Sequence, residues 1–308
     1  MSKNLASSGH KIGQLIGDWF EEELATYLLS RVAKDLNLYL DHRFKNRKCR
    51  QGKIIWKALD GSEVDYDFVL ELGGTDDEKG IPLAFFETFW RRRAGHSRDK
   101  ARDDSGKLLP MGETYPTARI LGILAAGDFT APAQEFIKGR GIDLFYIPKT
   151  FIYASWAKAG IPMEHGEKAS EEEKSKIAEF AVSKINKASK KVIFDNLIST
   201  IGQSVFNSYI DKIKAGIAAI PIEYKITSIF VGKTVAFTEF QDVVDYIKNS
   251  AVYKDKDIAE QLYRYEAVFS DGKIFERLDL TTDEALLLHS SVGKVSDFFD
   301  KYHKIVKA

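Results

Sequence analysis

Two carboxylates occupy positions from which they can act together on a phosphate ester. Asp67 lies in a segment where polar and apolar residues alternate, and Glu87 interrupts an otherwise apolar run. The two segments are predicted to be neighbouring antiparallel strands, so a suitable register brings both carboxylates to one divalent cation. Mg²⁺ prefers oxygen ligands and is often held by one or two carboxylates. It lowers the pKa of a bound water and neutralises charge that develops on a phosphodiester. We therefore predict that Asp67 and Glu87 are catalytic metal ligands, with Asp65 as an alternative ligand or outer partner.

A third carboxylate is predicted on the first helix. Apolar residues recur at helical spacing from residue 12 to about residue 36, which is typical of a helix with one buried stripe. At about 100° per residue, Glu23 falls near the middle of that stripe, whereas Glu21 and Glu22 fall off it. A carboxylate that faces a core needs a partner. Glu23 is therefore either a third acidic residue of the site or a member of a buried or snorkelling ion pair.

The strands that position Asp67 and Glu87 follow this helix. Residues 53–59 and 63–72 are predicted to form a hairpin through Asp60-Gly61, a dipeptide that tolerates the positive φ of a two-residue turn. Residues 81–90 are apolar on both faces apart from Glu87 and Thr88, as in a central strand. The remaining elements are a polar helix from about residue 96, a strand over 118–126, a helix over 131–138 and a strand over 141–147. This order predicts an α/β fold with a mixed sheet.

The second half of the chain has a different pattern. Ser170 and Glu173 form a capping box for a charged helix, and a more apolar helix is predicted over residues 192–213. A strand, turn, strand and helix then occur twice, with Gly-Lys turns 40 residues apart at Gly232-Lys233 and Gly272-Lys273. We find no candidate catalytic cluster there. We predict a first domain over 1–155 and a C-terminal α+β recognition or dimerisation domain over 156–308.

The order of elements from residue 12 to 147 resembles the PD-(D/E)XK nuclease superfamily, the fold of many restriction endonucleases. Tyr66-Asp67-Phe68-Val69-Leu70 is similar to its acidic second-strand motif, and Phe85-Phe86-Glu87-Thr88-Phe89 is similar to its third-strand motif. The resemblance implies a restriction-endonuclease-like αβββαβ core, often with a glutamate from the first helix, which here would be Glu23. It implies Mg²⁺-dependent hydrolysis of double-stranded DNA by metal-activated water.

One position departs from the family pattern. Phe89 stands where the family has a lysine. Variant members recruit a lysine from the following helix, which makes Lys100 the candidate, with Lys107 in reserve. The alternatives are that these lysines belong to a solvated, salt-bridged face, and that the chain is a catalytically degenerate DNA-binding or scaffold subunit of a defence complex.

Charge averaged over the chain does not favour nucleic-acid binding. The 308 residues include 45 Lys plus Arg and 45 Asp plus Glu, so the formal charge at pH 7 is zero, whereas phosphate contacts need cations. Local clusters over 42–50 and 91–102 still predict a DNA surface, unless they are ordinary exposed segments balanced by nearby acids. The predicted DNA-binding residues are Arg43, Lys45, Arg91, Arg92, Arg93 and Arg98.

Composition limits the remaining classes. Cys49 is the only cysteine, so an internal disulfide is excluded, and no apolar run is long enough for a membrane span. The chain has no nucleophile elbow, dinucleotide fingerprint or phosphate-binding loop. We expect a soluble, reduced, cytoplasmic protein without a membrane partner. Cutting both DNA strands usually takes two active sites, so we expect a homodimer, with a partner methyltransferase encoded nearby as a further possibility.

Overall fold

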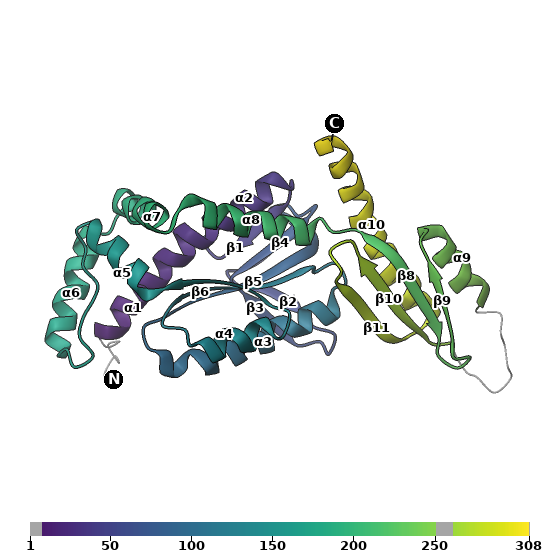
Figure 1. The fold of residues 1–308 in the computed structure, drawn as a ribbon, viewed down its shortest axis with the longest axis horizontal. Coiled ribbons are helices and arrows are strands. Elements are labelled where there is room, and N and C mark those ends of the chain that lie inside the picture. Colours follow the sequence, from purple (N-terminus) through teal and green to yellow (C-terminus); the bar gives the residue numbers. More distant parts are fainter. Residues whose placement is uncertain (1–7, 251–260, 308) are drawn as a thin grey trace.

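A five-stranded mixed sheet forms the centre of the larger part of the molecule (Figure 1). The structure is a computed structural model that describes residues 8–250 and 261–307. The strands are β1 (Tyr39–His42), β4 (Phe68–Leu72), β5 (Ile81–Arg91), β6 (Ile120–Gly127) and β7 (Asp143–Pro148), and this is also their order in the sheet. The pairs β1–β4 and β4–β5 are antiparallel, whereas β5–β6 and β6–β7 are parallel. The predicted α/β fold with a mixed sheet is therefore confirmed.

Helices cover both faces of this sheet (Figure 1). One face carries α1 (Ser8–Trp19), η1 (Phe20–Ala25), α2 (Thr26–Asp35), α5 (Lys149–Lys158), α7 (Lys187–Ile201) and α8 (Gln203–Ile217), with α6 (Glu171–Lys184) against α1. The other face carries α3 (Ser97–Thr114), preceded by η2 (Ala94–His96), and α4 (Ala131–Lys138). The first core lies between the sheet and the face that carries α1, and the second core lies between the sheet and α3 and α4. Along β5, Phe86 and Trp90 enter the first core, whereas Phe85 and Phe89 enter the second. Both faces are apolar because both are covered.

The predicted hairpin forms, but it lies outside the main sheet. Within the described residues, β2 (Ile54–Lys57) and β3 (Glu63–Tyr66) pair with each other and with no other strand, around Gly61 with a φ of 81°. The predicted single strand over 63–72 is divided at Asp67, so that β3 and β4 belong to different sheets. Strict alternation would place Tyr66 and Phe68 on one face, but they enter different cores. The chain therefore changes direction at Asp67, and β1, which was not predicted, pairs with β4 at the edge.

The first helix contains a π-helical turn. The helical segments α1, η1 and α2 follow one another without interruption from Ser8 to Asp35, and Phe20–Ala25 is the π segment. A π turn holds more residues than an α turn, so it rotates the sequence that follows relative to the core. The turn leaves Glu21 only 6% exposed.

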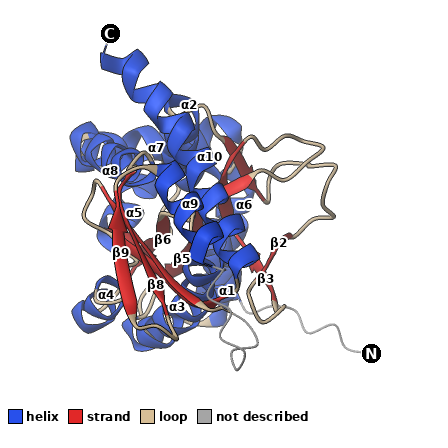
Figure 2. Cartoon of the chain, turned by 90° about the vertical axis from the view of Figure 1, so that its right-hand side faces the viewer, coloured by secondary structure: helices blue, strands red, loops and turns tan. Residues whose placement is uncertain are grey.

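The C-terminal repeat is confirmed as two strand–strand–helix units. The first is β8 (Pro221–Ser228), β9 (Lys233–Phe237) and α9 (Phe240–Ser250), and the second is β10 (Tyr263–Phe269), β11 (Ile274–Leu280) and α10 (Thr282–Lys307). Their strands form one antiparallel sheet in the order β11-β10-β8-β9, with α9 and α10 on one face (Figure 2). The capping box at Ser170 is present, and the predicted helix over 192–213 is divided at Gly202, whose φ is 99°.

The first core extends well beyond residue 155. Ile193, Leu197, Phe206 and Ile213 belong to the same buried cluster as the main sheet, and the separate C-terminal cluster starts at Ala219. The predicted boundary between residues 155 and 156 thus falls inside one packed core. Among the described residues, no helix is both long and apolar enough to cross a membrane.

Candidate active site

The sheet register brings Asp67 and Glu87 together. Phe68 pairs with Phe86, and one further antiparallel step sets Asp67 opposite Glu87. The backbone N–H and the hydroxyl of Thr88 both donate to Asp67 Oδ2, at 2.7 and 2.9 Å. Strand β5 therefore supplies one of the two carboxylates and fixes the orientation of the other.

Glu87 points toward α3 and is only 2% exposed. Lys107 Nζ donates to its Oε2 at 2.9 Å, while Oε1 is buried without a hydrogen-bond partner among the described residues. Burial, followed by the charge of Asp67, raises the pKa of Glu87 to about 8. A carboxylate that is costly to ionise and has an unpaired buried oxygen is chemically suited to a cation.

The lysine on Glu87 is Lys107 and not Lys100. Lys100 Nζ donates instead to Asp104 Oδ1 at 2.6 Å, within the same helix. Asp104 is fully buried, its Oδ2 has no partner among the described residues, and burial raises its pKa. The prediction that Lys100 occupies the place of the missing motif lysine is therefore not supported by the geometry, and the reserve candidate stands beside Glu87.

The helix carboxylate near the site is Glu21. Burial, and then the charge of Asp67, raise the pKa of Glu21 to about 8, and Arg43 Nε lies 2.6 Å from its Oε1. Glu23 was predicted for this place, but its pKa is raised by burial and by Glu22, and the cations around it are Lys187, Lys190 and Lys191 of α7. Glu23 thus faces α7, because the π turn displaces the face that a uniform α-helix would present.

Asp67 links the two sides of the sheet. Its charge raises the pKa of Glu21 on the α1 side and of Glu87 and Asp104 on the α3 side. The break between β3 and β4 accounts for this position, since Asp67 lies where the chain leaves one core for the other. Asp65 lies in the hairpin instead, where its Oδ1 accepts from the backbone N–H of Ile54 at 2.9 Å.

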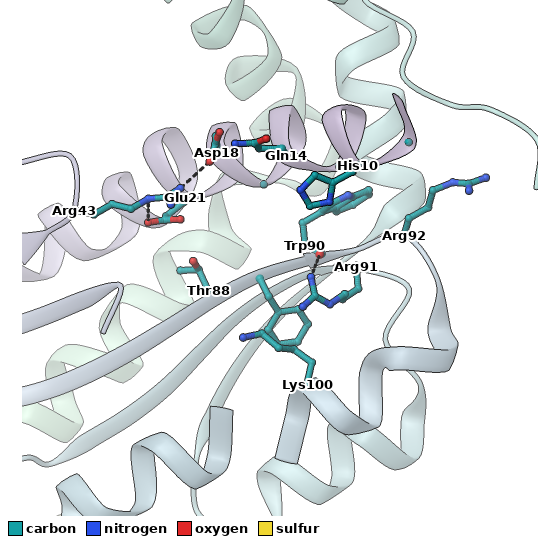
Figure 3. Close-up of a pocket in the computed structure, with 14 residues that line it drawn as sticks. His10, Gln14, Asp18, Glu21, Arg43, Thr88, Trp90, Arg91, Arg92 and Lys100 are labelled. Carbon is teal, nitrogen blue, oxygen red and sulfur yellow. Dashed lines mark hydrogen bonds and ion pairs between the residues drawn. The ribbon is translucent and has the colours of Figure 1, made fainter. Parts of the chain in front are cut away.

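A cavity of about 510 Å³ opens beside Glu21. It lies between α1 and the end of β5, with Glu21 and Arg43 toward one end and His10 and Arg92 toward the other (Figure 3). Thr88, which holds Asp67, also lines it. Asp67 and Glu87 themselves do not line the cavity, so Thr88 is its link to them, and its wall carries several cations.

The basic segment near residues 43–50 is partly structural. Arg47 is fully buried and pairs with Asp41 and Glu71 at 2.9 and 2.5 Å, and Arg50 joins Asp41. Arg43 pairs with Asp18 as well as Glu21. Lys45 lies 3.4 Å from Asp76 and 3.9 Å from the ring centroid of Tyr39. Of the two predicted DNA contacts here, Arg43 lines the cavity and Lys45 does not.

The second basic segment is more available to a ligand. Arg91 and Arg92 line the cavity, while Arg93 and Arg98 are exposed and do not line it. Arg91 donates to the backbone oxygen of Trp90 at 3.2 Å. These side chains therefore remain candidates for contacts with a nucleic-acid backbone.

The protein supplies few metal ligands. Over residues 8–250 and 261–307, no group of three or more His, Cys, Asp or Glu side chains is placed to hold a metal ion. A site on Asp67 and Glu87 would therefore depend on water and substrate oxygens for its other ligands, which Mg²⁺ tolerates. Sequence reasoning missed Glu21, because uniform helical spacing places it off the buried stripe, whereas the structure leaves it 6% exposed.

Comparisons with known proteins add little. No protein-family model matches the chain, and no curated protein sequence matches it. One solved structure, the crystal structure of the protein of unknown function AF1548, is similar over 65% of this chain and 95% of that one, with 12% identity and a TM-score of 0.27. A likeness at that level supports no argument about fold or activity.

Proposed function

We propose that the chain is a Mg²⁺-dependent DNA endonuclease of restriction-endonuclease type, with a variant PD-(D/E)XK core. The observation that carries the proposal is the group formed by Asp67, Glu87 and Lys107, which contains two acids on paired strands and a lysine from the next helix. Lys107 supplies the cation that Phe89 cannot supply at the motif position.

The carboxylates fit the proposed metal. Glu87 has an unpaired buried oxygen and a pKa raised to about 8, so a divalent cation beside it would favour its ionised form. Asp67 and Glu87 would hold the ion. When bound, Mg²⁺ would supply a water of lowered pKa and positive charge against the phosphodiester.

The surrounding residues have separate roles in this proposal. Thr88 orients Asp67 through two hydrogen bonds. Lys107, with a side chain 41% exposed, fixes Glu87 and extends positive charge toward the substrate. Glu21 and Arg43 form an ion pair at the cavity wall, where they can orient water or a phosphate oxygen.

Double-stranded DNA is the proposed substrate. Arg91, Arg92 and Lys100 line the cavity that Thr88, the partner of Asp67, also lines, so backbone phosphates can meet cations there. Cleavage of both strands would be achieved by a homodimer with one site per chain. A restriction or other anti-phage role, with a methyltransferase encoded nearby, is part of the same proposal.

Plasmid cleavage tests the site directly. We expect unmodified DNA to be cut with Mg²⁺, and Asp67→Asn or Glu87→Gln to lower the rate by about 10²-fold or more, as loss of a metal ligand does. Asp65→Asn is the matched control, because Asn can still accept the Ile54 hydrogen bond. Unchanged cleavage by the Asp67 and Glu87 variants would remove this site from the proposal.

A catalytically degenerate DNA-binding or scaffold subunit of a defence complex is the second candidate. The observation in its favour is that Lys107 Nζ already lies 2.9 Å from Glu87 Oε2, one of the oxygens that a metal would need. Calorimetric titration with Mn²⁺ separates the two candidates. If the chain is a nuclease, the wild type should bind Mn²⁺ and the Asp67→Asn variant should not. If the domain is degenerate, it should bind DNA equally well with and without metal.

A further inference from the structure

A second cationic cavity adjoins the first. It also measures about 510 Å³ and lies at the end of β5, between the beginnings of α1 and α6. Its lining is Gly9, His10, Arg91, Arg92, Arg93, His165, Glu171 and Lys174. Four of these, Gly9, His10, Arg91 and Arg92, also line the first cavity. In Figure 3, His10 and Arg92 mark the end of the first cavity that lies away from Glu21.

The charges in this second cavity are unequal. Three arginines and Lys174 face a single carboxylate, Glu171. Glu171 accepts from Lys174 Nζ at 2.9 Å and from the backbone N–H of Ser8 at 3.1 Å. Arg92 donates to the backbone oxygens of His165 and Gly166, at 2.7 and 3.2 Å. In the part of the chain that the structure describes, no carboxylate pairs with Arg91, Arg92 or Arg93, so their charge is not neutralised, and the two backbone contacts of Arg92 hold its side chain in place.

His165 brings a buried ring nitrogen to this cavity. Its Nδ1 lies 3.3 Å from the backbone oxygen of Met163, while its Nε2 is buried with no hydrogen-bond partner among the described residues. Burial, and then the charges of Arg92, Lys174 and Arg93, lower the pKa of His165. With Nδ1 donating to the Met163 oxygen, Nε2 of the neutral ring is an acceptor. It can donate to an anion only when the ring is protonated, a form that a bound anion would favour.

We propose that this second cavity binds a phosphate group of the nucleic-acid strand whose cleaved bond lies at Asp67 and Glu87, with Arg92, Arg93, His165 and Lys174 as its contacts. The nucleic-acid part of this statement rests on the proposed function. Two sources share the phosphate chemistry, an internal phosphodiester and a terminal phosphomonoester. The segment between α5 and α6, together with α6, would then belong to the substrate surface.

Binding without metal tests the subsite separately from catalysis. Fluorescence anisotropy in EDTA would compare wild type with His165→Gln and Lys174→Gln on labelled oligonucleotides that carry a 5′-phosphate, a 3′-phosphate or neither. Each variant should bind about three- to tenfold more weakly, and Lys174→Gln should lower the slope of log K against log salt by about one unit. Lys176→Gln is the control, because Lys176 lies on the same helix but outside this cavity.

The three oligonucleotides distinguish the sources of phosphate. A loss seen only with a phosphorylated end assigns the subsite to a terminal phosphate, and an equal loss with all three assigns it to an internal one. Lys174→Arg should keep wild-type affinity, which separates loss of charge from loss of folding. Wild-type affinity in both His165→Gln and Lys174→Gln would overturn the subsite, as would no binding of any oligonucleotide by the wild type.

Failure of the two proposals is distinguishable. A protein that never cuts DNA, but whose binding depends on His165 and Lys174, retains the subsite and loses the endonuclease. An active endonuclease with unaffected binding in these variants retains the catalytic site and loses the subsite.

Discussion

Lys100 and Lys107 lie on one helix but neutralise different carboxylates. Lys107 reaches Glu87, whereas Lys100 reaches Asp104. From the sequence alone, either lysine could replace the motif lysine that is absent at Phe89, because both lie on the helix after β5. Choosing between them requires the position of α3 along the sheet, which depends on packing in the second core and not on local spacing.

The two lysines should therefore have different kinetic effects. Lys107→Gln removes the partner of a buried carboxylate and charge near the reacting phosphate, so kcat should fall by about 10²-fold or more. Lys100→Gln leaves Glu87 intact and removes a cation from the cavity wall, so KM should rise and kcat change little. Steady-state cleavage kinetics measure both values. The reverse pattern would assign the motif role to Lys100.

Glu87 also predicts a pH-dependent stability. Its pKa is about 8 in the folded chain, against an ordinary value of 4.5 for a glutamate exposed to water. The raised pKa means that the folded chain holds the proton of Glu87 more tightly than the unfolded chain does. The stability that this proton contributes is fully present below pH 4.5 and is lost as pH rises through about 8. The free energy of unfolding of Glu87→Gln should thus exceed that of the wild type by about 1–3 kcal/mol at pH 8, and by much less at pH 5.

Urea unfolding at pH 5 and pH 8 measures this difference. Adding Mg²⁺ at pH 8 should stabilise the wild type, since the cation favours ionised Glu87, and should leave Glu87→Gln unchanged. Parallel behaviour of the two proteins at both pH values would show that Glu87 is ionised in the folded chain without a cation.

At the scale of elements, two irregular features form the site. The π turn moves Glu21 toward the sheet, and the break between β3 and β4 places Asp67 between two cores. Regular periods of 3.6 and 2 residues predicted the helix and the strands but not these two features. The sequence does carry a signal for the π turn. The buried residues before the turn include Ile16, Trp19 and Phe20, and those after it include Leu24, Ala25 and Leu28. The later set lies one residue further along the chain than strict α spacing would place it.

Matched glutamate variants test the π turn. Glu21→Gln should lower cleavage by about tenfold or more, because Glu21 shares the electrostatic environment of Asp67. Glu23→Gln should stay within about twofold, since it alters a contact with the lysines of α7. Supercoiled-plasmid cleavage under single-turnover conditions compares the two. Equal loss in both variants would contradict the assignment of Glu21.

At the scale of the whole molecule, the zero net charge conceals two kinds of basic cluster, one paired with buried acids and one without acidic partners among the described residues. Arg47 and Arg50 belong to a buried network with Asp41 and Glu71. Arg91 and Arg92 line both cavities and Arg93 lines the second, and none of the three has an acidic partner among the described residues. The sequence identified both clusters. It could not separate them, because the acids that neutralise the first cluster are distant in the chain and meet it only after β1 and β4 pair.

Contacts between residues far apart in the sequence also explain why the predicted domain boundary at residue 155 falls inside one core. Composition changes near residue 155, but Trp19 packs 5.7 Å from Trp156 and donates to the backbone oxygen of Lys190, and Phe145 packs against Phe206 and Tyr209. These contacts join the first helix and the last strand of the main sheet to α5, α7 and α8. The C-terminal module is attached by fewer contacts, such as the ion pair between Arg119 and Asp271 at 2.8 Å.

Truncated chains test whether the first folding unit ends near residue 155, where the composition changes, or near residue 219, where the first core ends. A chain of residues 1–155 exposes several large side chains, at about 1.5–3 kcal/mol each, against a total stability of about 5–15 kcal/mol. It should show no cooperative thermal transition by circular dichroism. A chain of residues 1–219 keeps α5 to α8 and loses mainly Val295 and Phe299 from the first core, so it should unfold cooperatively at a lower temperature than the full chain. Cooperative unfolding of 1–155 would instead place the energetic boundary where the composition changes.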